Sequence, residues 1–201
     1  EGAEKILSFF LTDFDENELR DCVTKAYGDN FSVPEITPVV RLHEHLHMLE
    51  LWHGPTCAFK DMALQILPRL MVKAMNKTGE NAEIVILTAT SGDTGKAALE
   101  GFADVEGTRI IVFFPNGGVS EIQRLQMVTQ TGSNTSAIAV NGNFDDTQTG
   151  VKKIFNDEKI CTALQNSGYR FSSANSINWG RLVPQIVYYF SAYAELVKDN
   201  S

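Results

Sequence analysis

Apolar residues follow two patterns that alternate along most of the chain. In one pattern they recur at helical spacing, and in the other they form short continuous runs. Apolar positions at helical spacing predict an amphipathic helix over residues 59–77, in which Pro68 should cause a kink or a break. The runs 84–87, 110–114 and 137–140 are continuously apolar, which is typical of strands buried on both faces of a parallel sheet.

Strand, loop and helix then repeat to the end of the sequence. A fourth strand is predicted at 169–171. Helices are predicted from the 91–95 turn to residue 103, at 120–129, within 141–156 and at 178–197. This order predicts an α/β fold, an open parallel sheet with helices on both faces.

The first quarter of the chain has a different organisation. Residues 13–27 predict a capped helix, with acidic residues early and a lysine late. Apolar residues at 39–40 and 48–49 flank a polar turn and predict a short hairpin. We therefore divide the chain into an N-terminal segment with a helix and a hairpin, residues 1–53, and an α/β domain, residues 54–201.

Composition and charge restrict the kinds of partner. The chain has 201 residues, of which 43% are hydrophobic and 21% charged, and this suits a soluble globular protein with a sizeable core. The net charge of -8 would repel nucleic acid, and no apolar run reaches the roughly 18 residues that suggest a membrane-spanning helix. Cys22, Cys57 and Cys161 are odd in number and far apart, and the start lacks a signal-peptide pattern. We therefore expect free thiols in a reducing, cytoplasmic compartment.

The polar loops after the predicted strands should lie together, because the carboxyl ends of parallel strands meet at one edge of a sheet. These loops span 90–95, 115–120, 141–146 and 172–178, and we interpret the third mainly as a helix-capping loop. Their backbone N–H groups and hydroxyls suit a carboxylate or phosphate, which Arg181 could clamp. None has the spacing of a dinucleotide or Walker-type loop. The sequence therefore predicts an anion-binding cleft of another kind.

Lys60 stands in an unusual place for a lysine. The segment 53–61, HGPTCAFKD, makes a Gly-Pro turn and then enters the predicted 59–77 helix, so Lys60 falls in the first turn of that helix. The positive N-terminal end of a helix and partial burial both favour the neutral, nucleophilic form of an amine. The alternative is a solvated surface lysine, which is the fate of most lysines.

A metal site is a weaker candidate. His43, His45 and His47 alternate along the sequence, so on one strand they would share a face and could bind a metal. No acidic or cysteine ligand clearly converges on this polar turn. We therefore interpret it as solvated surface and expect no metal.

Several of these segments resemble the threonine synthase family, a group of pyridoxal-phosphate enzymes of fold type II. Residues 49–65, LELWHGPTCAFKDMALQ, resemble the cofactor-lysine segment of the family, and residues 90–95, TSGDTG, resemble its substrate-anion loop. Residues 114–127 and 173–185 resemble two further family segments. The resemblance covers nearly all of residues 36–197.

The resemblance implies pyridoxal 5'-phosphate as the cofactor. Lys60 would be the catalytic residue that forms the Schiff base with it and later moves protons on the substrate. Phe59 and Asp93 would be the other residues at the cofactor. Residues 54–201 would then form a cofactor and substrate domain.

The substrate that the resemblance implies is a small phosphorylated amino acid. Ser91, Gly92 and Thr94 would hold its carboxylate, and Asn178 and Arg181 would hold its phosphate. The expected activity is that of the phospho-lyases among the threonine synthase-like proteins, which convert O-phosphohomoserine or O-phosphothreonine to 2-oxobutyrate, ammonia and phosphate. The alternative within the family is threonine synthase proper, in which water adds to give threonine.

Enzymes of this family are longer at both ends. Their glycine-rich cradle for the cofactor phosphate lies beyond the point that corresponds to Ser201, so the resemblance implies a fragment or short form with an incomplete fold. This leaves open whether the chain is an active carbon–oxygen lyase. The alternative is a non-catalytic, secreted short form that signals through a cell-surface partner.

Overall fold

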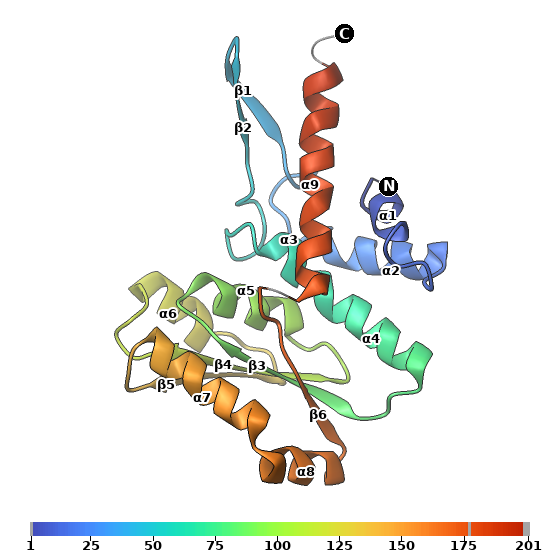
Figure 1. Cartoon of the computed structure of the whole chain (residues 1–201). Helices are drawn as coiled ribbons and strands as arrows, with labels where there is room; N and C mark the ends of the chain where they lie inside the picture. The colour runs from blue at the N-terminus through green and yellow to red at the C-terminus, as the bar shows by residue number, and fades with distance from the viewer. Residues whose placement is uncertain (1, 177, 199–201) are drawn as a thin grey trace.

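A four-stranded parallel sheet lies at the centre of the molecule (Figure 1). The computed structural model describes residues 2–176 and 178–198, so Ile177 of the predicted 172–178 loop and the last residues of the predicted second domain lie outside the described residues. The strand order is β5-β4-β3-β6, which confirms the open parallel sheet. The strands are β3 Glu83–Ala89, β4 Thr108–Pro115, β5 Thr135–Val140 and β6 Tyr169–Ser172.

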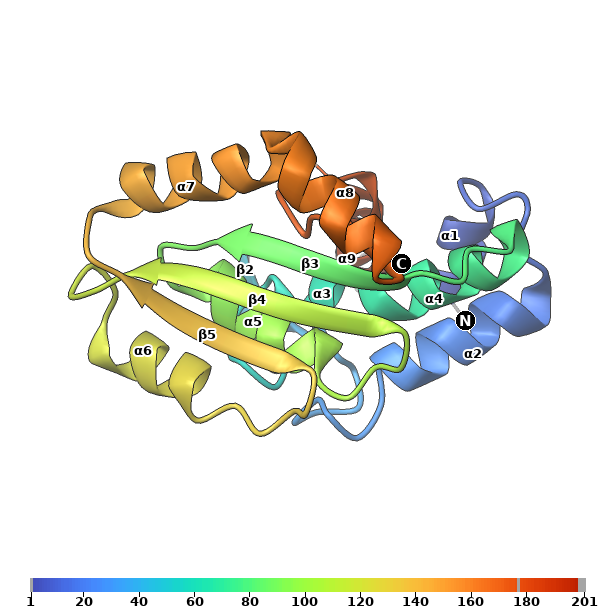
Figure 2. The ribbon, with the colours of Figure 1, turned by 90° about the horizontal axis from the view of Figure 1, so that it is seen from below.

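Helices cover both faces of this sheet, as predicted, and Figure 2 shows the two layers. One face carries α5 and α6, and the opposite face carries α7 and α8. These helices are α5 Asp93–Phe102, α6 Glu121–Val128, α7 Phe144–Asn156 and α8 Glu158–Asn166. Because β3 and β4 lie inside the sheet between two helical layers, their sequences are runs of apolar residues rather than alternating ones.

Each face of the sheet has its own apolar core. Ile86 of β3 packs with Phe102 of α5 in one cluster. Its neighbours Val85 and Leu87 point to the other face and pack in a second cluster with Val151 of α7. This alternation is the period of two that a strand imposes on its side chains.

The remaining elements lie on the α5 side of the sheet or stand away from it (Figure 1). They are α1 Gly2–Ser8, α2 Glu16–Ala26, β1 Val39–His43, β2 Leu46–Leu49, α3 Asp61–Leu64, α4 Leu67–Thr78 and α9 Trp179–Lys198. The α9 helix contacts α1, α3 and β1, so it joins the end of the chain to its beginning. The antiparallel β1–β2 pair and the capped α2 helix confirm the predicted hairpin and first helix.

The helix predicted over 59–77 is broken, which is one of the two effects expected of Pro68, but the break lies before the proline. The segment forms a single turn, α3, and a separate helix, α4, with Pro68 in the first turn of α4. A proline ring collides with the carbonyl group four residues earlier, and here that residue is Leu64, where α3 ends. Two short helices, α1 and α8, were not predicted from the sequence.

Candidate functional site

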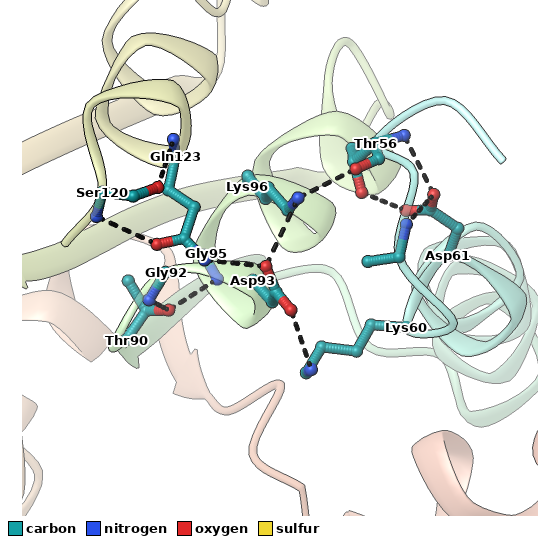
Figure 3. Close-up of polar contacts among 11 residues, drawn as sticks. Thr56, Lys60, Asp61, Thr90, Gly92, Asp93, Gly95, Lys96, Ser120 and Gln123 are labelled. Atoms are coloured by element: carbon teal, nitrogen blue, oxygen red, sulfur yellow. Dashed lines mark hydrogen bonds and ion pairs between the residues drawn. The ribbon is translucent and has the colours of Figure 1, made fainter. Parts of the chain in front are cut away.

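Lys60 immediately precedes α3 and points toward the start of α5 (Figure 3). Its side chain is 18% exposed, and its Nζ lies 3.6 Å from Oδ2 of Asp93. The same Nζ lies 4.3 Å from the centre of the Phe59 ring. The structure therefore brings together the three predicted cofactor residues. Because α3 is only one turn long, it supplies much less of a helix dipole than the predicted long helix would.

Asp61 folds the segment before Lys60 back onto α3. Its buried carboxylate accepts hydrogen bonds from the backbone N–H of Thr56 at 2.9 Å and from the Thr56 hydroxyl at 2.6 Å. Burial raises the pKa of Asp61, and these hydrogen bonds act against that rise. A Cβ atom at Gly54 would lie 2.5 Å from a carboxylate oxygen of Asp61, so this close turn requires glycine. The turn at Gly-Pro-Thr thereby fixes the position of the backbone that leads into Lys60.

Asp93 is the centre of a polar network that joins three segments (Figure 3). Besides its contact with Lys60, its Oδ1 accepts a hydrogen bond from Gln123 of α6 at 2.9 Å and lies 3.3 Å from Nζ of Lys96. Burial by itself would raise the pKa of Asp93, but Gln123, Lys96 and Lys60 together hold this pKa below its ordinary value. Asp93 is therefore a carboxylate at neutral pH.

The predicted substrate loop is closed by Thr90. The buried Thr90 hydroxyl accepts hydrogen bonds from the backbone N–H groups of Gly92 at 2.9 Å and Gly95 at 2.8 Å. Gly92 has a φ of 139°, and a Cβ atom there would overlap the Gln123 side chain. The Gly92 N–H is thus already used inside the loop, and Gly92 is buried rather than at the pocket surface.

A pocket of about 480 Å³ opens at the carboxyl ends of β3 and β6. Four of the predicted substrate residues line it, namely Ser91, Thr94, Asn178 and Arg181. Phe59, Lys60 and Asp93 are not among its lining residues, so the predicted site consists of two neighbouring groups. Thr94 and Asp93 are adjacent on the first turn of α5, which is where the two groups meet.

The side of the pocket formed by the loop after β6 and by α9 carries a buried positive charge. Arg181 is 2% exposed, and its Nη1 donates a hydrogen bond to the carbonyl oxygen of Ala174 at 3.0 Å. Its Nε is buried and has no hydrogen-bond partner, and the same holds for Oγ1 of Thr88, which also lines the pocket. Burial lowers the pKa of Arg181. A guanidinium nevertheless stays charged in proteins, and it calls for a compensating anion.

No acidic residue is among those that line this pocket in the described part of the chain. The lining instead includes a second cation, Lys152, which α7 supplies together with Gln148. The Lys152 amine donates a hydrogen bond to Gln148 at 3.4 Å. Two basic side chains and several hydroxyl and amide groups with no carboxylate between them are chemically suited to an anion.

Asn178 is used inside its own loop. Its amide Nδ2 donates to the carbonyl oxygen of Ser173 at 2.9 Å, and its Oδ1 accepts from the backbone N–H of Gly180 at 2.8 Å. Its side chain therefore shapes the start of α9, and its contact with a ligand stays a prediction.

Sequence reasoning missed Lys96, Gln123, Gln148 and Lys152. For Lys96 a signal existed, because a lysine three residues after Asp93 on one helix is spaced for an ion pair. Gln123 is the residue that completes the Ser120 capping box of α6, a pattern that is readable from sequence but does not reveal the contact with Asp93.

The histidine turn does not present one face. His43 ends β1, His45 lies in the turn and His47 lies on β2, so the three do not share a strand, which was the condition for a common face. Across residues 2–176 and 178–198, no group of three or more His, Cys, Asp or Glu side chains is arranged to hold a metal ion. Within the same residues, no helix has both the length and the apolar character to cross a membrane.

Curated proteins similar to this chain are threonine synthases and threonine synthase-like proteins, whereas no family model matches it. Threonine synthase-like 1 of Homo sapiens is 42% identical over 188 residues. The threonine synthase of Schizosaccharomyces pombe is 40% identical over 208 residues. These alignments cover 90% and 100% of this chain but only 25% and 39% of the relatives. The chain thus spans between a quarter and two fifths of the length of these relatives.

The solved structures that are similar to this chain include threonine synthases as well. A threonine synthase of Brucella melitensis with bound pyridoxal phosphate is 42% identical and superposes with a TM-score of 0.84, over 96% of this chain and 41% of that one. The yeast threonine synthase superposes with a TM-score of 0.85 at 35% identity, over 96% of this chain and 39% of that one. The predicted fold type II architecture is therefore confirmed for the region present. The chain is therefore homologous to one region of the longer threonine synthases and threonine synthase-like proteins.

Proposed function

We propose that this chain forms the cofactor-lysine and substrate-anion region of a pyridoxal-phosphate-dependent phospho-lyase of the threonine synthase kind. Lys60 is the cofactor amine, with Phe59 and Asp93 beside it. The neighbouring pocket, which has no acidic side chain among its lining residues, binds the phosphate or carboxylate of a small phosphorylated amino acid.

The observation that carries the proposal is the buried Arg181 in a pocket without a carboxylate. Leaving a charge buried without a counterion is costly, and proteins normally pair it. Here the first turn of α5 separates that cation from the Lys60–Asp93 pair. The amine on one side of this turn fits a cofactor that bonds to an amine. The anion site on the other side fits a substrate that carries an anionic group.

The residues of the two groups would have different roles in the reaction. Pyridoxal phosphate, when bound, supplies an electron sink for a carbanion. In this proposal the Lys60 amine takes a proton from the substrate α-carbon and returns one to a later carbon of the substrate. The Asp93 carboxylate can stabilise the ammonium form that Lys60 takes while it holds that proton. Ser91, Thr94 and Arg181 would orient the substrate by its anionic ends.

O-Phosphohomoserine and O-phosphothreonine are the substrates that we propose. Either compound and one water molecule give 2-oxobutyrate, ammonia and phosphate. The relatives named threonine synthase favour a second outcome, in which the same site yields threonine and phosphate from O-phosphohomoserine. The product other than phosphate separates these two reactions.

Labelling with the cofactor tests the role of Lys60. The chain would be incubated with pyridoxal phosphate, reduced with borohydride and digested, and the labelled peptide identified by mass spectrometry. We expect the label on Lys60, and we expect Lys60→Ala to remove it. Lys77→Ala serves as a control, because Lys77 pairs with Glu18 on another part of the surface. Label found only on other lysines would contradict the proposal.

Turnover tests the reaction separately. Release of phosphate from each phosphoamino acid would be measured with the chain and with Lys60→Ala, together with 2-oxobutyrate and threonine. We expect phosphate release to require Lys60. Phosphate release that persists in Lys60→Ala would exclude this lysine from the chemistry.

A further inference from the structure

We propose that Ser32, His53 and Glu50 form a second nucleophilic site, at which Ser32 accepts the acyl group of a small activated ester. The three side chains come from two segments that pack together, the bend at 31–33 and the segment that follows β2. None of them lines the pocket at the carboxyl ends of β3 and β6. The proposal therefore goes beyond the reaction proposed for Lys60 and does not depend on it.

A chain of two side-chain hydrogen bonds is the first observation. Oγ of Ser32 lies 3.0 Å from Nδ1 of His53, and Nε2 of the same imidazole lies 2.6 Å from Oε2 of Glu50. Hydrolytic enzymes activate a serine with such an arrangement, in which a base contacts the hydroxyl and a third group orients the base. Ser32, His53 and Glu50 thus occupy the positions of nucleophile, base and orienting group.

The same contacts assign the tautomer of His53. A carboxylate only accepts hydrogen bonds, so Nε2 of His53 carries the hydrogen in the contact with Glu50. In the neutral imidazole the other nitrogen, Nδ1, is then an acceptor, and the Ser32 hydroxyl donates to it. The lone pair of Nδ1 therefore faces the proton that has to leave when Ser32 attacks an acyl carbon.

Backbone contacts hold the serine beside the histidine. The N–H of Ser32 donates to the carbonyl oxygen of His53 at 2.9 Å, so the main chain joins the two residues as well. The preceding residue, Phe31, is buried and packs edge-on against Tyr27, and the ring of Trp52 lies 5.8 Å from that of His53. The hydroxyl and the imidazole are therefore in position before an ester arrives, which is an advantage in catalysis.

The exposure of the three side chains follows the order that this chemistry needs. The side chains of His53 and Glu50 are 14% and 21% exposed, so water only weakly screens the attraction between them once His53 has taken a proton. Ser32 is exposed, so an ester reaches its hydroxyl directly from solution.

Acyl transfer at this site needs only the ester and water. Oγ of Ser32 bonds to the acyl carbon while His53 takes the hydroxyl proton, and the ester carbon–oxygen bond then breaks as the alcohol leaves with that proton. A water molecule attacks the acyl-serine in the same way, which releases the carboxylic acid and returns a proton to Ser32. In total, one ester and one water molecule give one carboxylic acid and one alcohol.

Acetylation by p-nitrophenyl acetate tests the proposal. The full chain would be treated briefly with this ester and digested, and acetylation of each serine would be measured by mass spectrometry. We expect Ser32 to react at least about tenfold faster than Ser8, because a positioned base typically contributes roughly a hundredfold or more. Ser8 is the internal reference, since its exposed hydroxyl donates to the backbone carbonyl oxygen of Lys5 instead of to a histidine. Equal acetylation of the two serines would overturn the proposal without any variant.

Two histidine variants separate catalysis from folding. His53→Gln should lower the acetylation of Ser32 to the level of Ser8. His45→Gln, the matched control, changes a histidine in the exposed turn of the hairpin and should leave the acetylation of Ser32 unchanged. Thermal unfolding followed by circular dichroism reports the stability of each variant. A lower melting temperature of His53→Gln with undiminished acetylation of Ser32 would show that these hydrogen bonds only join two segments, and would refute the proposal.

Glu50 is a positioning residue in this proposal, because it acts through His53. Glu50→Gln should lower the acetylation of Ser32 at least about tenfold, since an amide does not stabilise the positive charge that His53 gains. Nitrogen-15 NMR of the imidazole in mildly alkaline solution gives a readout that is independent of the reaction. We expect the wild type to carry its ring hydrogen on Nε2, and a hydrogen on Nδ1 instead would rule out His53 as the base.

Discussion

Arg181 illustrates how a single residue can reveal a ligand. Its guanidinium is buried at the start of α9, donates to one backbone carbonyl oxygen and keeps an unpartnered Nε. Removal of a buried charge without a counterion is often neutral or stabilising, because the cost of desolvating that charge disappears. If Arg181 served only the fold, the chain would gain little by keeping it. An anion in the pocket, as proposed above, would supply the missing counterion.

Arg181→Met tests this interpretation. Without ligand we expect the free energy of unfolding to stay the same or to rise by about 1 kcal/mol, because the uncompensated charge is gone. We expect inorganic phosphate to raise the melting temperature of the wild type but not that of the variant. Arg109→Met, which removes a surface partner of Glu83, should keep the response to phosphate. A large loss of stability with an intact phosphate response would show that Arg181 is structural.

The sequence was sufficient to predict part of the site at this scale. The segment around Lys60 and the 90–95 loop were recognisable as short contiguous patterns. The contacts Lys60–Asp93 and Lys96–Thr56 join residues 33 and 40 positions apart, so they depend on how α3 packs against α5. Hydrogen bonds that satisfy Gly92 and Asn178 inside their own loops were likewise not evident from residue type.

Helices α3 and α5 approach so closely that their backbones meet. A Cβ atom at Gly101 of α5 would overlap the carbonyl oxygen of Leu64, the last residue of α3. This oxygen belongs to the backbone, so it cannot rotate away as a flexible side chain could. Gly101 is therefore what allows the two elements that carry Lys60 and Asp93 to lie side by side.

Gly101→Ala should force α3 and α5 apart. We expect it to lower the free energy of unfolding by roughly 3 kcal/mol, as overpacking of a core commonly does. Gly150→Ala is the matched control, because Gly150 lies in α7 and a Cβ atom added there would meet nothing within 4 Å. That change should raise the free energy of unfolding by about 0.5–1 kcal/mol through helix propensity. Urea unfolding of both variants would check this, and equal effects would refute the close-approach explanation.

At the scale of elements, long periodic patterns were predicted well and short ones were not. The buried strands and the helices between them follow from apolar runs and spacing. The α8 helix was missed because a single residue, Asp157, ends α7 and caps α8, so the two helices have no loop between them. The break between α3 and α4 was expected near Pro68, but the steric effect of a proline is felt a full turn earlier.

The whole molecule exposes an apolar surface along α9. Its large exposed hydrophobic residues are Trp179, Leu182, Tyr189, Phe190, Tyr193 and Val197. The β1–β2 hairpin, which rises beside α9 in Figure 1, exposes four more, namely Val40, Leu42, Leu46 and Met48. Many exposed apolar side chains on two neighbouring elements favour contact with other protein surface.

We expect the isolated chain to self-associate through this surface and to bind the dye ANS. Phe190→Glu combined with Tyr193→Glu should lower dye fluorescence and return the mass measured by light scattering toward that of a monomer. Ile122→Glu, which removes an exposed apolar residue from α6 instead, should change neither measurement. A monomeric wild-type chain without dye binding would contradict the expectation.

Some predictions at this scale stay predictions. The boundary between residues 53 and 54, the cytoplasmic location and its secreted alternative are not addressed by the fold. The same is true of a non-catalytic form that binds a cell-surface partner. These properties depend on processing and on other molecules rather than on the packing of this chain.

The contact between Gly101 and Leu64 also has a consequence for motion. Two backbones in direct contact cannot slide past each other freely, so α3 and α5 should move as one rigid body and keep the backbone of Lys60 near the start of α5. The opposite side of the pocket is formed by α7, which packs on β3, β4 and α8. If the pocket tightens around a bound anion, we expect α7 and its Lys152 to move, while the backbone next to Lys60 keeps its position relative to α5.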